Sequence, residues 1–102
     1  MTRLRITINI DGVVGDENSV RIPVLDRGFL YGDSVYEVLR TYGGKLFAVA
    51  DHLERLKHSA DRIELSLPPS RYLHEKLCET ISASGNDESW CRLIVTRGVG
   101  PL

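Results

Sequence analysis

The chain has 102 residues, with 13 basic and 14 acidic side chains and a formal net charge of −1. This length suits one domain, and a composition of 42% hydrophobic and 26% charged residues is typical of soluble globular proteins and excludes a disordered chain. The balanced charge offers no field that recruits nucleic acid or an anionic membrane, so we expect neither partner, and any anion must be bound by a local site.

The N-terminal segment, MTRLRITINI, alternates polar and apolar side chains over residues 3–9. This period of two predicts a half-buried strand. Asp11-Gly12 then predicts a tight turn, from which Val13-Val14 begins the return strand of a hairpin. Because the segment lacks an uninterrupted apolar stretch, it is typical of neither a signal peptide nor a membrane span. We therefore expect a cytoplasmic protein.

Residues 26–28 predict a turn, and a second strand is predicted over residues 34–42. Successive side chains of a strand point to opposite faces. One face therefore holds Val35, Glu37, Leu39 and Thr41, and the other holds Tyr36, Val38, Arg40 and Tyr42. Gly43-Gly44 favours a tight turn because glycine adopts positive φ angles freely, and residues 45–47 are predicted to return as a short paired strand.

Two helices follow, and Pro68-Pro69 breaks the chain between them. Spacings of three and four place an apolar stripe on the first helix, at Leu53, Leu56, Ala60 and Ile63. A separate polar stripe on that helix holds His52, Arg55 and Ser59. The second helix is predicted to begin at a Ser70 cap and to end at Gly85. Its apolar positions are Leu73, Leu77 and Ile81.

Residues 90–96 alternate again and predict a last strand. The order of strands, two helices and a strand favours an α+β fold, in which two helices pack on a largely antiparallel sheet. The cysteines, Cys78 and Cys91, lack the spacing of a zinc site, so we expect no metal.

Three features of this arrangement are candidates for binding an anion. Tyr36 and Arg40 share a strand face, where hydroxyl and guanidinium donors suit a carboxylate; the alternative is a solvated face with aromatic–cation packing. Arg55 has the planar fork that suits phosphate oxygens, and the alternative is a solvated helix face. The strand that runs into the glycines of residues 96–102 resembles a backbone approach to an anion, but a lone Gly-x-Gly is weak evidence, and the segment taken alone favours a plain turn.

The segment DRGFLYGDSVYEVLRTY, residues 26–42, resembles the "DRG-x-x-x-GDG-v-[FY]-E-x-x-R" motif of fold-type IV pyridoxal-phosphate enzymes. These enzymes include branched-chain aminotransferases, D-amino acid aminotransferases and aminodeoxychorismate lyases. The resemblance continues through residues 44–47, extends into HLERL at 52–56, and reappears at 92–98. It implies that residues 1–102 are the N-terminal small domain of a class IV aminotransferase, and that the C-terminal domain with the cofactor-bonding lysine is absent.

The resemblance also implies roles for individual residues. Arg55 matches the arginine that binds the phosphate of pyridoxal 5'-phosphate, with His52 as its supporting partner. Tyr31 matches a tyrosine that reaches the neighbouring subunit's site in the branched-chain enzymes, which implies a homodimer. The implied substrate-binding residues are Tyr31, Tyr36, Arg40, Trp90 and Arg92.

Departures from the motif bear on the substrate. Phe29 stands where D-amino acid aminotransferases have a tyrosine that holds the substrate carboxylate, and a phenyl ring cannot make that hydrogen bond. Leu102 stands where those enzymes have a carboxylate-binding arginine. Ser34 replaces the usual glycine, which is a mild change. The departures favour a branched-chain L-amino acid and a 2-oxo acid as substrates; a D-amino acid aminotransferase and an aminodeoxychorismate lyase remain alternatives.

Lys45, Lys57 and Lys76 do not match the motif of the cofactor-bonding lysine. We therefore expect no catalytic residue in this chain, and we expect the isolated chain to be inactive. An alternative of another class is a non-catalytic module that binds a small anion through Arg55 and the Tyr36–Arg40 face, or that self-associates.

Overall fold

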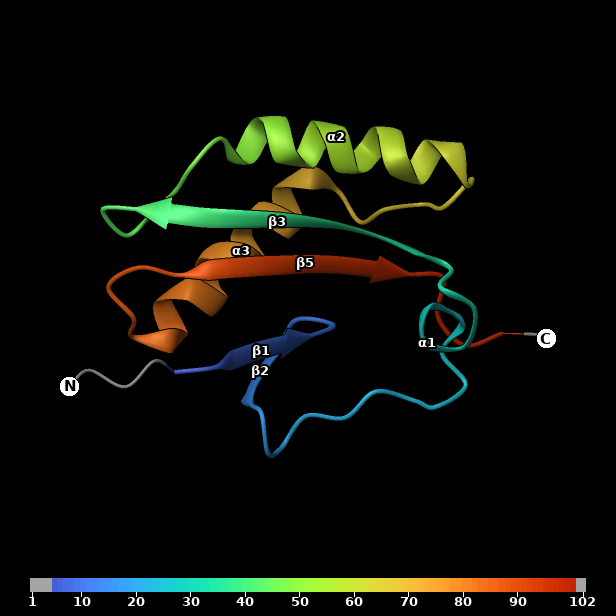
Figure 1. The fold of residues 1–102 in the computed structure, drawn as a ribbon, viewed down its shortest axis with the longest axis horizontal. Coiled ribbons are helices and arrows are strands. Elements are labelled where there is room, and N and C mark those ends of the chain that lie inside the picture. Colours follow the sequence, from blue (N-terminus) through green and yellow to red (C-terminus); the bar gives the residue numbers. More distant parts are fainter. Residues whose placement is uncertain (1–4, 101–102) are drawn as a thin grey trace.

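The computed structural model describes residues 5–100. Its elements, in chain order, are β1 (Thr7–Ile10), β2 (Val13–Asp16), α1 (Arg27–Tyr31), β3 (Ser34–Tyr42), β4 (Lys45–Leu46), α2 (Val49–Arg62), α3 (Ser70–Ser84) and β5 (Trp90–Thr96). An antiparallel sheet of order β4-β3-β5 forms the centre, and β1 and β2 form a separate hairpin. In Figure 1, α2 runs along β3 while α3 passes behind the sheet. This arrangement confirms the predicted α+β fold.

The pairing of β3 with β5 fixes the register of the central sheet. Opposite residues include Tyr36 and Ile94, Val38 and Arg92, and Arg40 and Trp90. Both strands have the predicted bounds, because their period-two patterns are long and are bounded by turn residues.

The core lies between the sheet and the two long helices. It contains Val35, Leu53, Leu56, Ala60, Leu65 and Leu73, against which Leu93 and Val95 pack. The predicted apolar stripe of α2 is therefore confirmed at three of its positions, whereas Ile63 is 37% exposed. Ile63 is the residue at which α2 ends, so it leaves the helical spacing that buries the others.

The hairpin of β1 and β2 confirms the prediction from Asp11-Gly12. Both turn residues have positive φ, 52° and 89°, as a two-residue hairpin requires. The Nδ2 atom of Asn9 donates to Oγ1 of Thr80 over 3.1 Å, which ties the hairpin to α3. The strand begins later than predicted, at Thr7, and residues 1–4 lie outside the described part.

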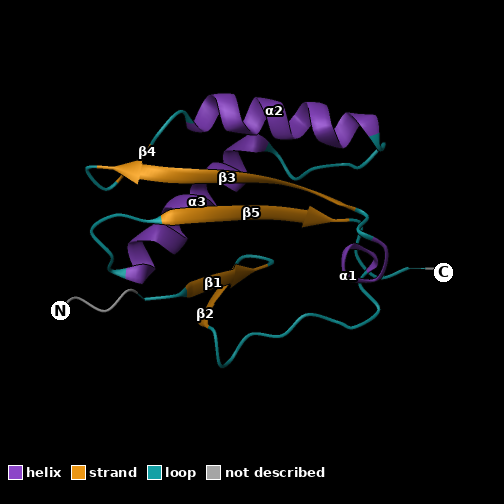
Figure 2. Ribbon diagram, viewed as in Figure 1, coloured by secondary structure: helices purple, strands orange, loops and turns teal. Residues whose placement is uncertain are grey.

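A short helix, α1, forms where a turn was predicted. The Asp26 carboxylate accepts from the backbone N–H of Phe29 over 3.0 Å and caps its start. Gly32, with φ of 68°, closes its end. The loop over residues 17–26 leads from β2 to this helix (Figure 2). Residues 5–100 thus contain three helices where two were predicted, because one turn of helix is too short to show a periodic pattern.

The cap predicted at Ser70 is also wrong by one residue. Ser70 is the first helical residue of α3, and Pro69 precedes it without a side-chain cap. Gly85 ends the helix in the left-handed conformation, as predicted.

The turn at Gly43-Gly44 is held by a carboxylate that the sequence did not single out. Glu88 accepts from the backbone N–H groups of Gly43 and Gly44 over 2.8 and 2.7 Å, and from the Thr41 hydroxyl over 2.7 Å. These donors, the Gly44 amide foremost, hold the pKa of Glu88 below its ordinary value.

Candidate cofactor and substrate site

Glu37 is a buried carboxylate on the helix-facing side of β3. It lies on the same strand face as Val35 and Leu39, and its side chain is 7% exposed. The Nδ1 atom of His52 lies 2.7 Å from Oε1 of Glu37. Arg55 approaches the same carboxylate through Nε, at 3.1 and 3.0 Å from its two oxygens, and through Nη2, at 2.7 Å from Oε1. The buried charge is therefore paired on two sides.

Helix α2 brings both partners to Glu37. His52 and Arg55 are three residues apart and so lie on one side of the helix. Leu53 and Leu56, 7% and 0% exposed, insert into the core and fix the rotation of α2 about its axis. The sequence pattern thus directs one stripe of α2 into the core and the adjacent polar stripe onto the carboxylate of β3.

The ion pair is charged at neutral pH. The hydrogen bonds from Arg55 chiefly, and those from His52 in addition, hold the pKa of Glu37 below its ordinary value, although desolvation opposes them. Glu37 in turn raises the pKa of Arg55 above its ordinary value. Because the carboxylate only accepts hydrogen bonds, the facing Nδ1 of His52 carries the proton.

The opposite face of the central sheet carries a second group of side chains. The guanidinium of Arg40 lies over the ring of Tyr42, at 3.9 Å, and near the ring of Trp90, at 5.1 Å. Arg92 lies 5.8 Å from the ring centre of Tyr36. Tyr36 and Trp90 are 61% and 73% exposed. The result is an open face of aromatic rings and guanidinium groups, which supplies fixed donors for a carboxylate.

The structure therefore separates the predicted site residues into two groups. Tyr36, Arg40, Trp90 and Arg92 lie together on the face of the sheet that the long helices leave uncovered. Arg55 pairs with Glu37, whose side chain points to the other face. Tyr31 lies apart from both groups, as the last residue of α1, and is 62% exposed.

Helix α1 is joined closely to the end of β5. The Thr96 hydroxyl donates to Asp26 over 2.6 Å, and Arg27 donates from Nε and Nη2 to the carbonyl oxygens of Gly98 and Arg97 over 2.9 and 2.8 Å. Gly28 packs so closely that a Cβ there would lie 2.5 Å from Cγ2 of Thr96. The carbonyl oxygens of Arg97 and Gly98, after β5, thus accept from a cation. The approach of backbone amides to an anion, the candidate that the segment favoured less than a plain turn, has no support within residues 96–100.

The sequence pattern predicted the strand face of Glu37 correctly, but we did not single Glu37 out as a candidate site residue. Its signal was a carboxylate between Val35 and Leu39 on the strand face that the apolar residues predict to be buried. Unpaired buried carboxylates are costly, so such a residue indicates a cationic partner on the element that covers it. The partner is on the polar stripe of α2, which the sequence also identified.

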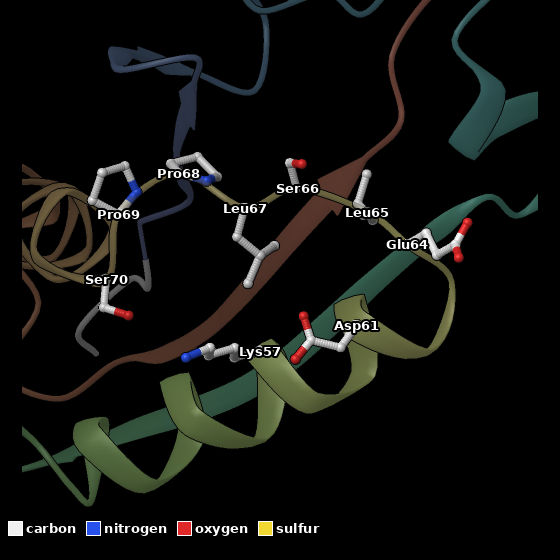
Figure 3. Close-up of a pocket in the computed structure, with 9 residues that line it drawn as sticks. All are labelled: Lys57, Asp61, Glu64, Leu65, Ser66, Leu67, Pro68, Pro69 and Ser70. Atoms are coloured by element: carbon white, nitrogen blue, oxygen red, sulfur yellow. The ribbon is translucent and has the colours of Figure 1, made fainter.

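A hollow of about 670 Å³ lies on a different side of α2. It is lined by Lys57, Asp61, Glu64, Leu65, Ser66, Leu67, Pro68, Pro69 and Ser70. Figure 3 shows Lys57 and Asp61 on α2 opposite the connection to α3. Lys57 follows Arg55 by two residues, which is a rotation of about 200° around the helix. The hollow is therefore separate from the Glu37 group.

The α+β domain thus carries the Arg55 guanidinium on the helix-covered side of its central sheet and those of Arg40 and Arg92 on the open side. A family model described as "Amino-transferase class IV" matches residues 34–102. The chain therefore belongs to the class IV aminotransferase family.

Individual relatives agree with this assignment. The D-alanine aminotransferase of Listeria innocua is 40% identical over 85 residues, which is 82% of this chain and 29% of the relative. The branched-chain aminotransferase of Thermoproteus uzoniensis, solved with norvaline, is 30% identical with a TM-score of 0.76 and covers 87% of this chain and 32% of its own. A hypothetical aminotransferase of Mycobacterium tuberculosis, solved in a PLP-bound form, is 28% identical with a TM-score of 0.80. The match covers 92% of this chain and 34% of the relative. The chain spans about a third of the length of the relatives it matches.

No helix within residues 5–100 combines the length and apolar character needed to cross a bilayer.

Proposed function

We propose that this chain is the N-terminal small domain of a pyridoxal-phosphate-dependent transaminase, which moves an amino group between an amino acid and a 2-oxo acid. The domain with the cofactor-bonding lysine lies outside residues 1–102. The observation that carries the proposal is the buried Glu37 carboxylate, which holds the exposed Arg55 guanidinium at one edge and leaves its other donors toward solvent.

The residues present fit the phosphate of the cofactor. A guanidinium has five N–H donors in a planar fork, and Glu37 accepts from the Nε side. The side chain of Arg55 is 68% exposed, so the remaining donors are accessible to phosphate oxygens. When bound, pyridoxal phosphate supplies the electron sink that amino-group transfer needs. This chain contributes Arg55, which binds the phosphate of the cofactor.

The open face of the sheet fits a substrate carboxylate. Tyr36, Arg40, Trp90 and Arg92 combine donors with aromatic surface. Tyr31 lies apart from them on α1, and its phenol is assigned to the site of the neighbouring subunit. An amino acid and a 2-oxo acid share a carboxylate beside the reacting carbon, so one such receptor serves both substrates. We assign these five side chains to substrate binding.

We propose a branched-chain L-amino acid as the amino donor. Phe29 on α1 offers no hydroxyl for a D-specific carboxylate contact, and the relative solved with norvaline is a branched-chain enzyme. Leu102, the second departure, lies outside the described residues. A D-amino acid is the second candidate, because D-alanine aminotransferases reach 40% identity. Aminodeoxychorismate lyase chemistry is the third, supported by a lyase of Pseudomonas aeruginosa that is 32% identical.

We propose that residues 1–102 alone are inactive. We propose that the complete protein is a cytoplasmic homodimer. Lys76 donates to Glu79 over 3.1 Å, and this hydrogen bond raises its pKa above the ordinary value. A protonated amine is a poor nucleophile. Lys45 and Lys57 are exposed, and solvated lysine is the ordinary state of that residue.

The test uses the polypeptide expressed from the complete reading frame, loaded with pyridoxal phosphate. L-valine, D-alanine and aminodeoxychorismate are supplied in separate reactions, and 2-oxo acid formation is measured. We expect turnover of L-valine in the presence of 2-oxoglutarate. Turnover of D-alanine without turnover of L-valine would reassign the substrate. Release of pyruvate from aminodeoxychorismate without turnover of either amino acid would replace the transaminase proposal with the lyase alternative. Absence of turnover with all three would contradict the transaminase proposal.

A further inference from the structure

We propose that Glu37 is a positioning residue, which orients Arg55 so that the Nη1–Nη2 end of its guanidinium meets the phosphate of pyridoxal phosphate. The proposal rests on the function proposed above, and it makes phosphate binding by Arg55 depend on Glu37. Glu37 does not touch the phosphate in this account. It acts through Arg55.

The contacts of Arg55 define which of its edges is open. Nε lies 3.1 and 3.0 Å from the two carboxylate oxygens of Glu37, and Nη2 lies 2.7 Å from Oε1. Among residues 5–100, Nη1 has no hydrogen-bonding partner, and Nη2 retains a second N–H. Because the guanidinium is planar and rigid, fixing its Nε–Nη2 edge also fixes the direction of the opposite end.

His52 holds the carboxylate from a second direction. Its Nδ1 lies 2.7 Å from Oε1 of Glu37, the same oxygen that accepts from Nη2 of Arg55. The Glu37 side chain is 7% exposed and the His52 side chain 20% exposed, whereas Arg55 is 68% exposed. The arrangement is a buried anchor that carries an exposed binding group.

Glu37 has two opposing effects on phosphate affinity. Its negative charge offsets the positive charge of Arg55 and weakens long-range attraction of phosphate. Its hydrogen bonds remove rotamer freedom from a long side chain before the ligand arrives, which lowers the entropic cost of binding. The bidentate contact and the burial of the carboxylate indicate that orientation is the larger effect.

The two effects predict opposite results for Glu37→Gln. This substitution keeps the shape and removes the charge. With the amide oxygen in the place of Oε1, the N–H₂ group takes the place of Oε2, faces the Nε–H donor of Arg55 and loses that acceptor. If orientation dominates, the variant binds phosphate more weakly, by about tenfold. If charge dominates, the variant binds more tightly. Glu37→Asp keeps the charge on a shorter side chain and should recover part of the affinity.

The experiment follows the Nε–H signal of Arg55 by nitrogen NMR in the 102-residue chain, during titration with pyridoxal phosphate and, separately, with inorganic phosphate. The variants are Glu37→Gln and Glu37→Asp. Glu54→Gln is the matched control. Glu54 is an exposed carboxylate on α2, the helix of Arg55, and it pairs with His58 instead of Arg55. We expect the control to bind as the unaltered chain does. Equal or tighter binding by Glu37→Gln would overturn the positioning role.

A second measurement needs no variant and stays decisive if Glu37→Gln does not fold. The mobility of Nε–H in the ligand-free chain is compared between Arg55 and Arg71, whose side chain is 90% exposed and faces Glu75 at 3.4 Å. We expect Arg55 to be the more rigid, with the higher order parameter. Equal mobility would overturn the positioning role. A rigid Arg55 that does not respond to pyridoxal phosphate would support positioning but count against the proposed phosphate site, which separates the two failures.

Discussion

Arg97 donates from Nε to the carboxylate of Asp33 over 2.6 Å and thereby joins the start of β3 to the end of β5. Its other nitrogens donate to the carbonyl oxygens of Glu64 and Ile63, where α2 ends. The hydrogen bond from Arg97 is the main cause that holds the pKa of Asp33 below its ordinary value. One side chain thus connects the sheet to the helix that carries His52 and Arg55.

Arg97→Ala is expected to lower the melting temperature of the chain, because three acceptors on two segments, before β3 and at the end of α2, lose their donor together. Arg71→Ala is the control, since Arg71 makes a single pair on an exposed helix surface. Thermal unfolding followed by circular dichroism measures both variants. A fall in the Arg97 variant no larger than that in the control would contradict the joining role.

Gly28→Ala is expected to destabilise the contact of α1 with β5 by about 1–3 kcal/mol, the usual cost of forcing extra volume into a packed site. The added Cβ would lie 2.5 Å from Cγ2 and 2.7 Å from Cβ of Thr96. Thr96→Ser removes the nearer atom and keeps the hydroxyl that donates to Asp26. Urea unfolding of the single and double variants should therefore show a smaller cost of Gly28→Ala in the serine background. An equal cost in both backgrounds would show that the clash lies elsewhere.

Acid is expected to destabilise the chain through three carboxylates. Asp33, Glu37 and Glu88 each have a pKa lowered by hydrogen bonds, so their stabilising effect is present above the ordinary carboxyl pKa values. It is lost as the pH falls below those values, about 4, toward the lower folded-state values. Urea unfolding between pH 7 and pH 3 measures the loss. Glu37→Gln should show a shallower dependence than the unaltered chain, and an identical dependence would contradict a charged Glu37.

The chain is expected to self-associate, because exposed apolar side chains gather on the uncovered face of the sheet. Trp90 and Ile94 are 73% and 54% exposed there, and such patches promote association. Ile94→Asp should shift the chain toward monomer in sedimentation. Val13→Asp is the control, because Val13 is 71% exposed on the separate hairpin. A monomer at high concentration of the unaltered chain would refute the expectation.

The long periodic elements could be predicted from the sequence, and the short elements could not. The patterns of β3, β5 and the core stripe of α2 follow from burial of one face, which is a local property of the sequence. Helix α1 depends on Asp26 and Gly32 at its ends, and one turn shows no period. The start of α3 differs from the predicted cap by one residue, because helix ends are defined by the sequence only to within one or two residues.

The side chains of the candidate site could be predicted from the sequence, but the contacts between them could not. Arg55 and the Tyr36–Arg40 face were found from spacing and from the family resemblance. That Arg55 is anchored on Glu37 follows from the packing of α2 on β3, a contact between residues 18 apart. The role of Arg27 was missed for the same reason, since its acceptors lie at the far end of the chain.

The central claim is that Arg55, held by Glu37, binds the phosphate of pyridoxal phosphate. The most direct measurement is the dissociation constant of this cofactor for the polypeptide of the complete reading frame, in the unaltered form and with Arg55→Ala and Arg71→Ala. Hydrogen bonds to charged groups contribute about 1.5–3 kcal/mol each, so Arg55→Ala should weaken binding by about 10- to 100-fold while Arg71→Ala leaves it unchanged. Equal affinity of the Arg55 variant and the unaltered protein would contradict the account.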